Sequence, residues 1–122
     1  MKEQPLQPRR GGAAPVRKGQ EGVALTIAKE EAAGNTVIGT EITIDTSAGT
    51  VRLDVGSRTP QGGLRLIDSK KGPKAGLTKN QKVGYPALEK EGGMPRGPRA
   101  QGAGLTDEPL PPTKVIIDRH DE

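Results

Sequence analysis

Residues 64–88 read LRLIDSKKGPKAGLTKNQKVGYPAL, and their pattern predicts a strand, a turn and a helix in succession. The first seven residues alternate between apolar and polar side chains, which indicates a β-strand. Glycine and proline follow and predict a turn. Thr78 and Gln81 then have the T-x-x-Q spacing of a capping box, so a helix is expected to begin there. The unusual feature is the end of the strand, where Asp68 and Lys70 are two positions apart and point to the same face.

The residues on either side of this stretch predict the remaining elements. Alternating β-branched residues indicate two earlier strands, and an apolar run near the C-terminus indicates a last strand, parallel to a neighbour. Apolar residues at helical spacing indicate a helix before the strands. Pro86 predicts that the second helix is kinked or split at Tyr85. The expected elements are a helix over 20–33, strands over 36–46, 50–55 and 64–70, a helix from Thr78, and a strand over 114–118.

The order α-β-β-β-α-β predicts an α/β domain with a small mixed sheet flanked by helices. This domain is expected to span residues 20–122. Residues 1–19 are rich in Pro, Gly, Gln and Arg and are expected to form a flexible linker or leader. Residues 92–112 are expected to be a Gly/Pro-rich loop that carries Arg96 and Arg99.

The composition excludes several kinds of site. Cysteine is absent, which excludes a disulfide framework and a thiolate zinc site. The single histidine, His120, stands beside the C-terminus, so a histidine metal cluster is excluded as well. No apolar run approaches the roughly 20 residues of a membrane span. The first residues also lack the apolar segment of a signal peptide.

The charge balance favours an anionic partner only weakly. Nineteen Lys and Arg residues oppose fifteen Asp and Glu residues, which gives a net charge of +4. Such an excess suits attraction to polyanions but is milder than that of an arginine-rich nucleic-acid coat protein.

Two acids and a lysine are expected to meet at one end of the sheet. Asp54 lies near the end of one strand and Asp68 near the end of the next, with a hairpin between them. Two carboxylates at close range repel each other unless a hard divalent cation lies between them. Lys70 beside them can orient or deprotonate an attacking water and offset charge on a scissile phosphate. The pattern therefore indicates a Mg²⁺ or Mn²⁺ site for phosphodiester hydrolysis.

These residues resemble the PD-(D/E)XK motif of restriction-endonuclease-like nucleases: Asp54, a hairpin, then Asp68 and Lys70 after an apolar strand. The expected element order is similar to that family's common core. Gln81 and Tyr85 resemble the Q-x-x-x-Y element of its RecB-like branch. Two departures are a leucine in place of the motif's proline and an aspartate where glutamate is more usual.

The wider stretch GPKAGLTKNQKVGYPALEKEGG resembles the nuclease domains at the C-terminal tips of bacterial polymorphic toxins. The resemblance covers residues 20–118 and implies a nuclease that acts on DNA rather than RNA and is used between bacteria. It also implies delivery as part of a larger parent toxin, action in the cytoplasm of the target cell, and a cognate immunity protein that covers the cleft.

The resemblance also implies roles for individual residues. The catalytic set is Asp54, Asp68, Lys70 and Gln81, with both aspartates as metal ligands. A glutamate of the first helix is expected to join the metal shell; we favour Glu21, with Glu31 as the second choice and Glu30 as a third candidate. The candidate nucleic-acid contacts are Lys71, Lys74, Lys79, Tyr85, Arg96 and Arg99.

Each of these features also has a structural interpretation. Asp68 and Lys70 can form a solvated ion pair, Gln81 can serve only as a cap, and the tyrosine can be a core residue. A non-catalytic nucleic-acid-binding module predicts binding that depends on salt but not on Mg²⁺ or Asp54. An RNA-cleaving toxin on the same fold is a further alternative, and a structural domain predicts no polyanion affinity beyond its charge.

Overall fold

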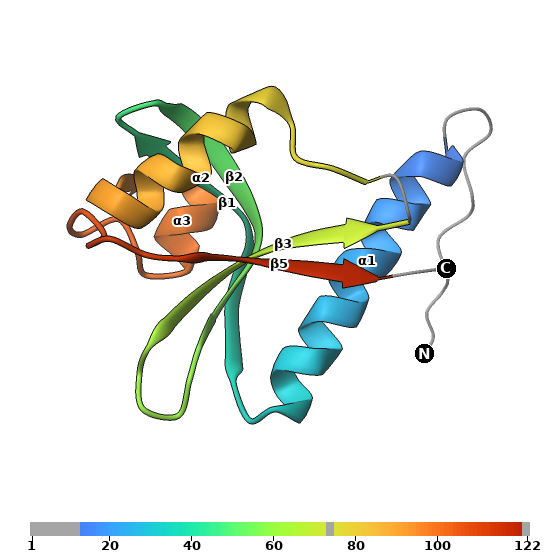
Figure 1. Cartoon of the computed structure of the whole chain (residues 1–122). Helices are drawn as coiled ribbons and strands as arrows, with labels where there is room; N and C mark the ends of the chain where they lie inside the picture. Colours follow the sequence, from blue (N-terminus) through green and yellow to red (C-terminus); the bar gives the residue numbers. More distant parts are fainter. Residues whose placement is uncertain (1–12, 73–74, 121–122) are drawn as a thin grey trace.

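The computed structural model describes residues 13–72 and 75–120, with side chains from Gln20 onward. These residues form an α/β arrangement in which helices flank a twisted sheet (Figure 1). The elements in chain order are α1 (Ala13–Ala32), β1 (Thr36–Thr46), β2 (Gly49–Arg58), β3 (Leu64–Lys71), α2 (Lys79–Glu91), β4 (Met94–Arg96), α3 (Pro98–Gly102) and β5 (Val115–His120).

The strands of the described residues form one mixed sheet in the order β4-β1-β2-β3-β5. The β4–β1, β1–β2 and β2–β3 pairs are antiparallel, and the β3–β5 pair is parallel. The α/β class, the mixed sheet flanked by helices and the parallel last strand are therefore confirmed. The expected α-β-β-β-α-β order holds as far as α2, and β4 and α3 then precede the last strand. α1 covers one face of the sheet, and α2 and α3 lie on the other (Figure 1).

α1 is fixed to the sheet by buried polar contacts. The Glu30 carboxylate is 6 % exposed and accepts hydrogen bonds from Arg65 at 2.8 and 3.0 Å and from Ser57 at 2.5 Å. One turn earlier, the Thr26 hydroxyl donates to Asp118 of β5 at 2.6 Å. Bonds to a charged group are stronger than neutral ones, and here they satisfy a buried carboxylate. The helix is therefore held over β2, β3 and β5.

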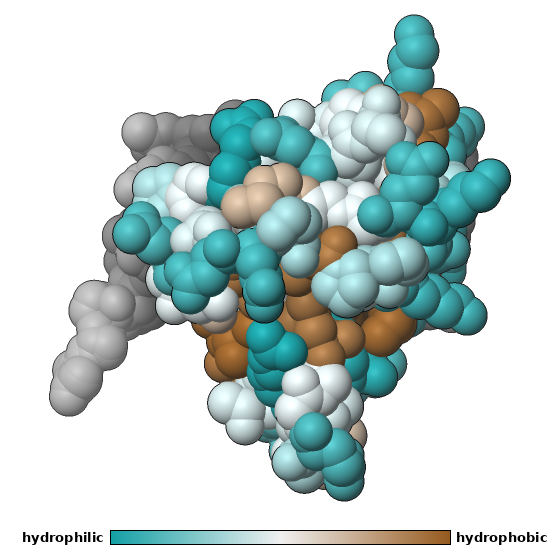
Figure 2. Space-filling view, turned by 90° about the vertical axis from the view of Figure 1, so that its left-hand side faces the viewer, coloured by the Kyte–Doolittle hydropathy of each residue, from teal (hydrophilic) through white to brown (hydrophobic). Residues whose placement is uncertain are grey.

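The main apolar core lies on the other face, beneath α2 and α3. On the side of the molecule that Figure 2 presents, apolar side chains also reach the surface, where they lie among hydrophilic neighbours. Partly buried hydrophobic residues such as Leu64 and Leu110 pack against the core beneath α2 and α3. Its buried members are Ile42, Ile44, Val51, Leu53, Leu66, Tyr85, Leu88, Ala100, Leu105 and Val115.

The first helix begins earlier than the sequence pattern predicts. α1 starts at Ala13 rather than Gln20, so part of the expected linker is helical; residues 1–12 lie outside the described residues. Alanine, arginine and lysine in this segment are good helix formers, and extending an existing helix costs little. Pro15 falls in the first turn, where its missing N–H removes no helical hydrogen bond.

The expected loop over 92–112 contains two short elements, so the loop prediction was wrong there. β4 pairs with the free edge of β1, where Thr43 lies opposite Arg96. α3 begins with Pro98, a residue that suits the first position of a helix. Tertiary pairing along the β1 edge supplies order that the Gly/Pro-rich composition does not indicate.

α2 continues through Pro86 and is not split at Tyr85. It also packs closely on the sheet, since a methyl group at Gly84 would clash with the side chain of Val51 on β2. Packing of Tyr85 and Leu88, both buried, holds the helix on either side of the proline. The close approach at Gly84 sets the distance between α2 and the sheet.

We expect Gly84→Ala to lower the free energy of unfolding by about 1–2 kcal/mol. Overpacking at a tight contact costs about 1–3 kcal/mol, and the better helix propensity of alanine returns about 1 kcal/mol at most. Gly102→Ala is the matched control, because Gly102 also lies in a helix but has nothing within 4 Å of the added methyl group. Urea unfolding measures both; equal stabilities would contradict the close packing of α2.

Candidate active site

β2 and β3 separate partway along their length and form a fork in the sheet. Their pairing runs from Arg58 opposite Leu64 to Val55 opposite Ile67 and stops there. Beyond this point β2 pairs only with β1, and β3 pairs only with β5. Asp54 and Asp68 occupy the first positions past the last pair, one on each branch. The fork thus places the two aspartates opposite each other, as the sequence predicts.

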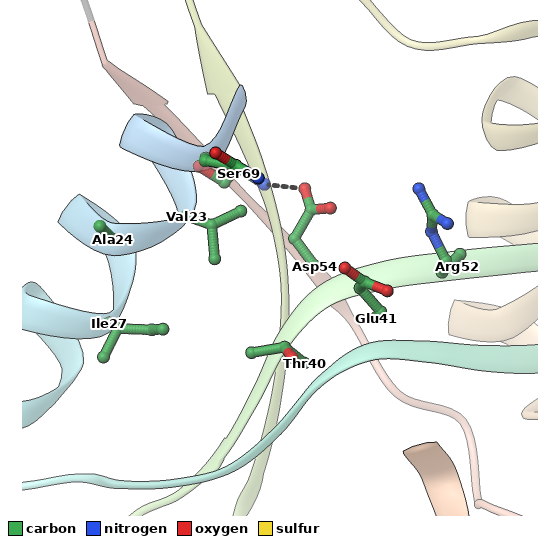
Figure 3. A pocket seen from close by; sticks show the side chains of 9 residues that line it. Val23, Ala24, Ile27, Thr40, Glu41, Arg52, Asp54 and Ser69 are labelled. Atoms are coloured by element: carbon green, nitrogen blue, oxygen red, sulfur yellow. Dashed lines mark hydrogen bonds between the residues drawn. The ribbon is translucent and has the colours of Figure 1, made fainter. Parts of the chain in front are cut away.

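Asp54 caps the backbone that the fork leaves unpaired. Its Oδ2 accepts a hydrogen bond of 2.8 Å from the Ser69 N–H (Figure 3). Burial raises the pKa of Asp54 to about 6; the Ser69 N–H opposes this shift, and the neighbouring Asp68 carboxylate adds to it. The Asp68 carboxylate is therefore close enough to disfavour the charged form of Asp54.

Asp68 is 2 % exposed and lies on the α2 side of the fork. The Lys70 ammonium is 3.3 Å from its Oδ2, which is an ion-pair distance. Even so, this oxygen has no hydrogen-bond donor among the described residues. Apart from the Lys70 ion pair, this buried oxygen is unsatisfied, which is costly and would favour a second cation beside it.

Lys70 is held between Asp68 and the start of α2. Its Nζ donates to the Gln81 side-chain oxygen at 3.0 Å, and the Thr78 N–H donates to the same oxygen at 2.8 Å. The Thr78 hydroxyl in turn accepts from the Gln81 N–H at 3.2 Å. The predicted capping box is confirmed, and Gln81 serves both as the cap and as the partner of Lys70.

Tyr85 lies beneath this cluster rather than on the surface. It is 4 % exposed, and burial, together with the nearby charge of Asp68, raises the pKa of its phenol. A side chain buried to this degree cannot stack on a base. The expectation that Tyr85 contacts nucleic acid was therefore wrong, and its role as a core residue is confirmed.

The glutamates of the first helix are not brought to the two aspartates. Glu30 is occupied by Arg65 and Ser57, as described above. Glu21 and Glu31 are exposed, and neither lines the pocket beside Asp54. One residue along a helix is a turn of about 100°, so Glu21 faces away from the sheet while its neighbour Gln20 faces the pocket.

The predicted basic contacts lie in different places. Lys71 is partly buried on the α1 side of β3, Lys79 is exposed at the first position of α2, and Lys74 lies outside the described residues. The two loop arginines, Arg96 and Arg99, are exposed. They form ion pairs of 2.7 Å with Asp45 and 3.7 Å with Glu41, respectively.

Glu41 is a site residue that the sequence did not reveal. The β1–β2 register places it opposite Asp54, and its φ of 54° is the one positive value at a non-glycine residue of the described chain. Such a conformation is uncommon outside glycine and often occurs at functional sites. The strand pattern carries no signal for it, because the alternation of Thr40, Glu41 and Ile42 is that of a regular strand.

A pocket of about 450 Å³ opens beside Asp54, between α1 and the sheet (Figure 3). Val23 and Ile27 point into it from α1. Glu41, Arg52 and Asp54 line it from the strands. The pocket gives the fork an approach from the α1 side, whereas Lys70 and Gln81 lie on the α2 side.

The two aspartates fit a hard divalent cation. Asp68 offers a buried oxygen without a hydrogen-bond donor, and the pKa of Asp54 is raised by burial and, to a smaller extent, by its acidic neighbour. The described residues contain no cluster of three acidic, histidine or cysteine side chains that could hold a metal. Magnesium binds through one or two carboxylates and keeps several waters, so two aspartates suffice for it.

Comparison with known protein families, curated proteins and solved structures finds no match for this chain. No helix within the described parts of the chain is long and apolar enough to cross a membrane.

We expect Asp54→Asn to stabilise the metal-free protein at pH 7.5 and to have little such effect near pH 4. The pKa of Asp54 is about 6 in the folded protein, against an ordinary value of 3.8. Between these values the folded chain holds the proton more tightly, so its stability falls as pH rises from about 4 to 6. Asparagine does not ionise, so the Asp54→Asn variant does not lose stability in this way as the pH rises.

Urea unfolding in EDTA at several pH values measures the effect. Asp45→Asn is the control with the opposite sign, because hydrogen bonds from Arg96 and Thr50 lower the pKa of this exposed carboxyl. A stability difference between wild type and Asp54→Asn that does not change with pH would contradict the burial of Asp54 beside Asp68.

Proposed function

We propose that this domain is a metal-dependent nuclease that hydrolyses phosphodiester bonds, with DNA as the substrate. One observation carries the proposal: Asp54 and Asp68 stand at the first positions past the last β2–β3 pair, close enough for Asp68 to raise the pKa of Asp54, and Gln81 holds Lys70 beside Asp68. The opposed acids and the fixed lysine have the chemistry that a cation and a phosphate would complete.

Each residue has a defined role in this reaction. Asp54 and Asp68 would hold Mg²⁺ or Mn²⁺, which polarises the phosphate and acidifies a bound water. Lys70 is fixed at Nζ by Asp68 and Gln81, so it can orient the attacking water and offset the negative charge that develops on phosphate. Gln81 is a positioning residue: its oxygen holds both Lys70 and the Thr78 N–H.

The acid pair favours an enzyme over a binding module. On a surface that only binds phosphate, positive charge raises the affinity for phosphate. Carboxylates lower this affinity, because they repel the phosphate. Here a nearly inaccessible aspartate with an unsatisfied oxygen lies at the centre of the site. Lys70 offsets one negative charge here, but a second carboxylate beside it disfavours phosphate binding unless a metal ion is also bound, as a metal-dependent reaction requires.

The biological role is proposed from the sequence resemblance. The stretch 72–93 resembles the nuclease tips of polymorphic toxins, which supports an interbacterial toxin delivered within a larger protein. Its site of action would be the cytoplasm of the target cell. The producing cell would then need an immunity protein against its own domain.

Plasmid DNA is expected to be degraded by the purified domain with Mg²⁺ or Mn²⁺ and to stay intact in EDTA. Lys70→Met should lower the rate of DNA cleavage about 10²- to 10⁴-fold, which is the usual contribution of one positioned catalytic group. The loss should appear in turnover, with DNA binding nearly intact, because the role of Lys70 lies in the transition state.

Lys90→Met is the charge-matched control, since Lys90 is exposed in the last turn of α2. Equal rates of DNA cleavage for Lys70→Met and Lys90→Met would show that Lys70 acts only as a basic surface residue. Full activity in EDTA would remove the metal from the proposal, and RNA cleaved in preference to DNA would change the substrate.

Expression of the domain in bacteria is expected to stop growth and fragment the chromosome. Asp54→Ala and Asp68→Ala should each abolish this effect, because either change removes a metal ligand. Asp107→Ala, a change at an exposed loop aspartate, should stay toxic. Co-expression of the cognate immunity protein, expected to be small and acidic, should restore growth. Normal growth with the intact domain would rule out the toxin role.

A further inference from the structure

The pocket beside Asp54 has one apolar wall and one polar wall. The apolar wall comes from α1, where Val23, Ala24 and Ile27 share one face of the helix. Figure 3 shows Val23 and Ile27 directed across the pocket toward the strands. The polar wall comes from β1 and β2 and includes Arg52 and Asp54. The pocket therefore suits a ligand with a flat apolar surface and polar edges.

Arg52 adds a positive charge at the mouth of this pocket. It is exposed, and within the described parts of the chain it forms no ion pair or side-chain hydrogen bond. Figure 3 shows its guanidinium on the far side of Asp54 from α1. An arginine in this state is free to contact a phosphate bidentately. The pocket thus combines an apolar wall with a phosphate contact.

We propose that this pocket receives an unpaired nucleobase of the substrate strand, given the nuclease function proposed above. The pocket shares Asp54 with the metal site, so a base within it belongs to a nucleotide next to the scissile phosphate. Its volume of about 450 Å³ is in the range of small-ligand pockets. The domain then acts on single strands and on unpaired or extruded nucleotides, in preference to intact duplex.

Base pairing explains the preference. In a duplex, both faces of a base are covered by its neighbours, and its polar edge is paired. Only an unpaired base can place its flat face against Val23, Ala24 and Ile27, as bases do between apolar side chains in enzymes that extrude them. Tyr85, the only Phe, Trp or Tyr residue of the chain, is buried and cannot stack on a base, so the apolar wall of α1 is the surface in the pocket that can take the flat face of one.

The polar edge of the base would meet groups at the rim of the pocket. The Gln20 amide can both donate and accept hydrogen bonds, and the Glu41 carboxylate can accept from a base amino group. Both side chains line the pocket from opposite walls. The positive φ of Glu41 places a hydrogen-bond acceptor beside Asp54, and an amino group on the edge of a bound base would donate to it.

The test compares a short single-stranded DNA with the same sequence as a duplex. Cleavage with Mg²⁺ is expected to be at least about tenfold faster on the single strand, since extruding a paired base costs a few kcal/mol. Binding of each fluorescent DNA in EDTA, followed by anisotropy, gives a readout that does not require cleavage. It should show the same preference.

Ala24→Leu fills the pocket and is the decisive variant. It should weaken single-strand binding and cleavage by about tenfold or more, in the range reported for loss of one stacked base. Ala28→Leu is the matched control: it is the same change at an exposed position one turn further along α1, outside the pocket. It should leave both measurements within about twofold of wild type, because it alters no base contact.

The two proposals fail separately. Single-strand binding that depends on Ala24, with no cleavage under any metal, would support the base pocket and reject the nuclease. Equal cleavage of the two DNA forms, or equal effects of the two leucine variants, would reject the base pocket and leave the nuclease in place.

Discussion

The site depends on the point at which β2 and β3 stop pairing. An unpaired N–H inside a protein is costly, and the Ser69 N–H is satisfied by the Asp54 carboxylate instead of by a backbone carbonyl. This one bond of 2.8 Å keeps the strands apart and sets Asp54 opposite Asp68. A backbone pair at this position would close the fork and leave no room between the acids.

The two faces of the sheet then hold different parts of the site in place. On one face, α1 is anchored by the Glu30–Arg65 pair, which fixes the apolar wall of the pocket. On the other, the N-terminal cap of α2 holds Lys70, because a single Gln81 oxygen accepts from both the cap backbone and the ammonium. A local helix-capping interaction therefore also determines the position of the lysine.

Much of the fork was predictable from the sequence because its signals are local. The capping box and the spacing of Asp68 and Lys70 depend on neighbours within a few residues. The hairpin that brings Asp54 opposite Asp68 is marked by its turn residues. Features that depend on tertiary contacts were not predictable: β4 and α3 form along the edge of β1, and Tyr85 is buried by packing rather than by any pattern.

The glutamate ligand expected on α1 also depends on a tertiary contact that the sequence does not reveal. To predict whether Glu21 faces the aspartates, one must know how α1 is rotated about its own axis. This rotation is set by the residues at which the helix contacts the sheet. Gly22 is that contact, since a methyl group there would lie 2.9 Å from the Ser69 hydroxyl. With Gly22 against β3, Gln20 faces the pocket and Glu21 faces solvent. The small residue that permits close packing therefore decides which side chain α1 presents to Asp54, and it presents an uncharged one. α1 therefore adds no negative charge to that of Asp54 and Asp68, and one divalent cation can neutralise the charge of these two aspartates.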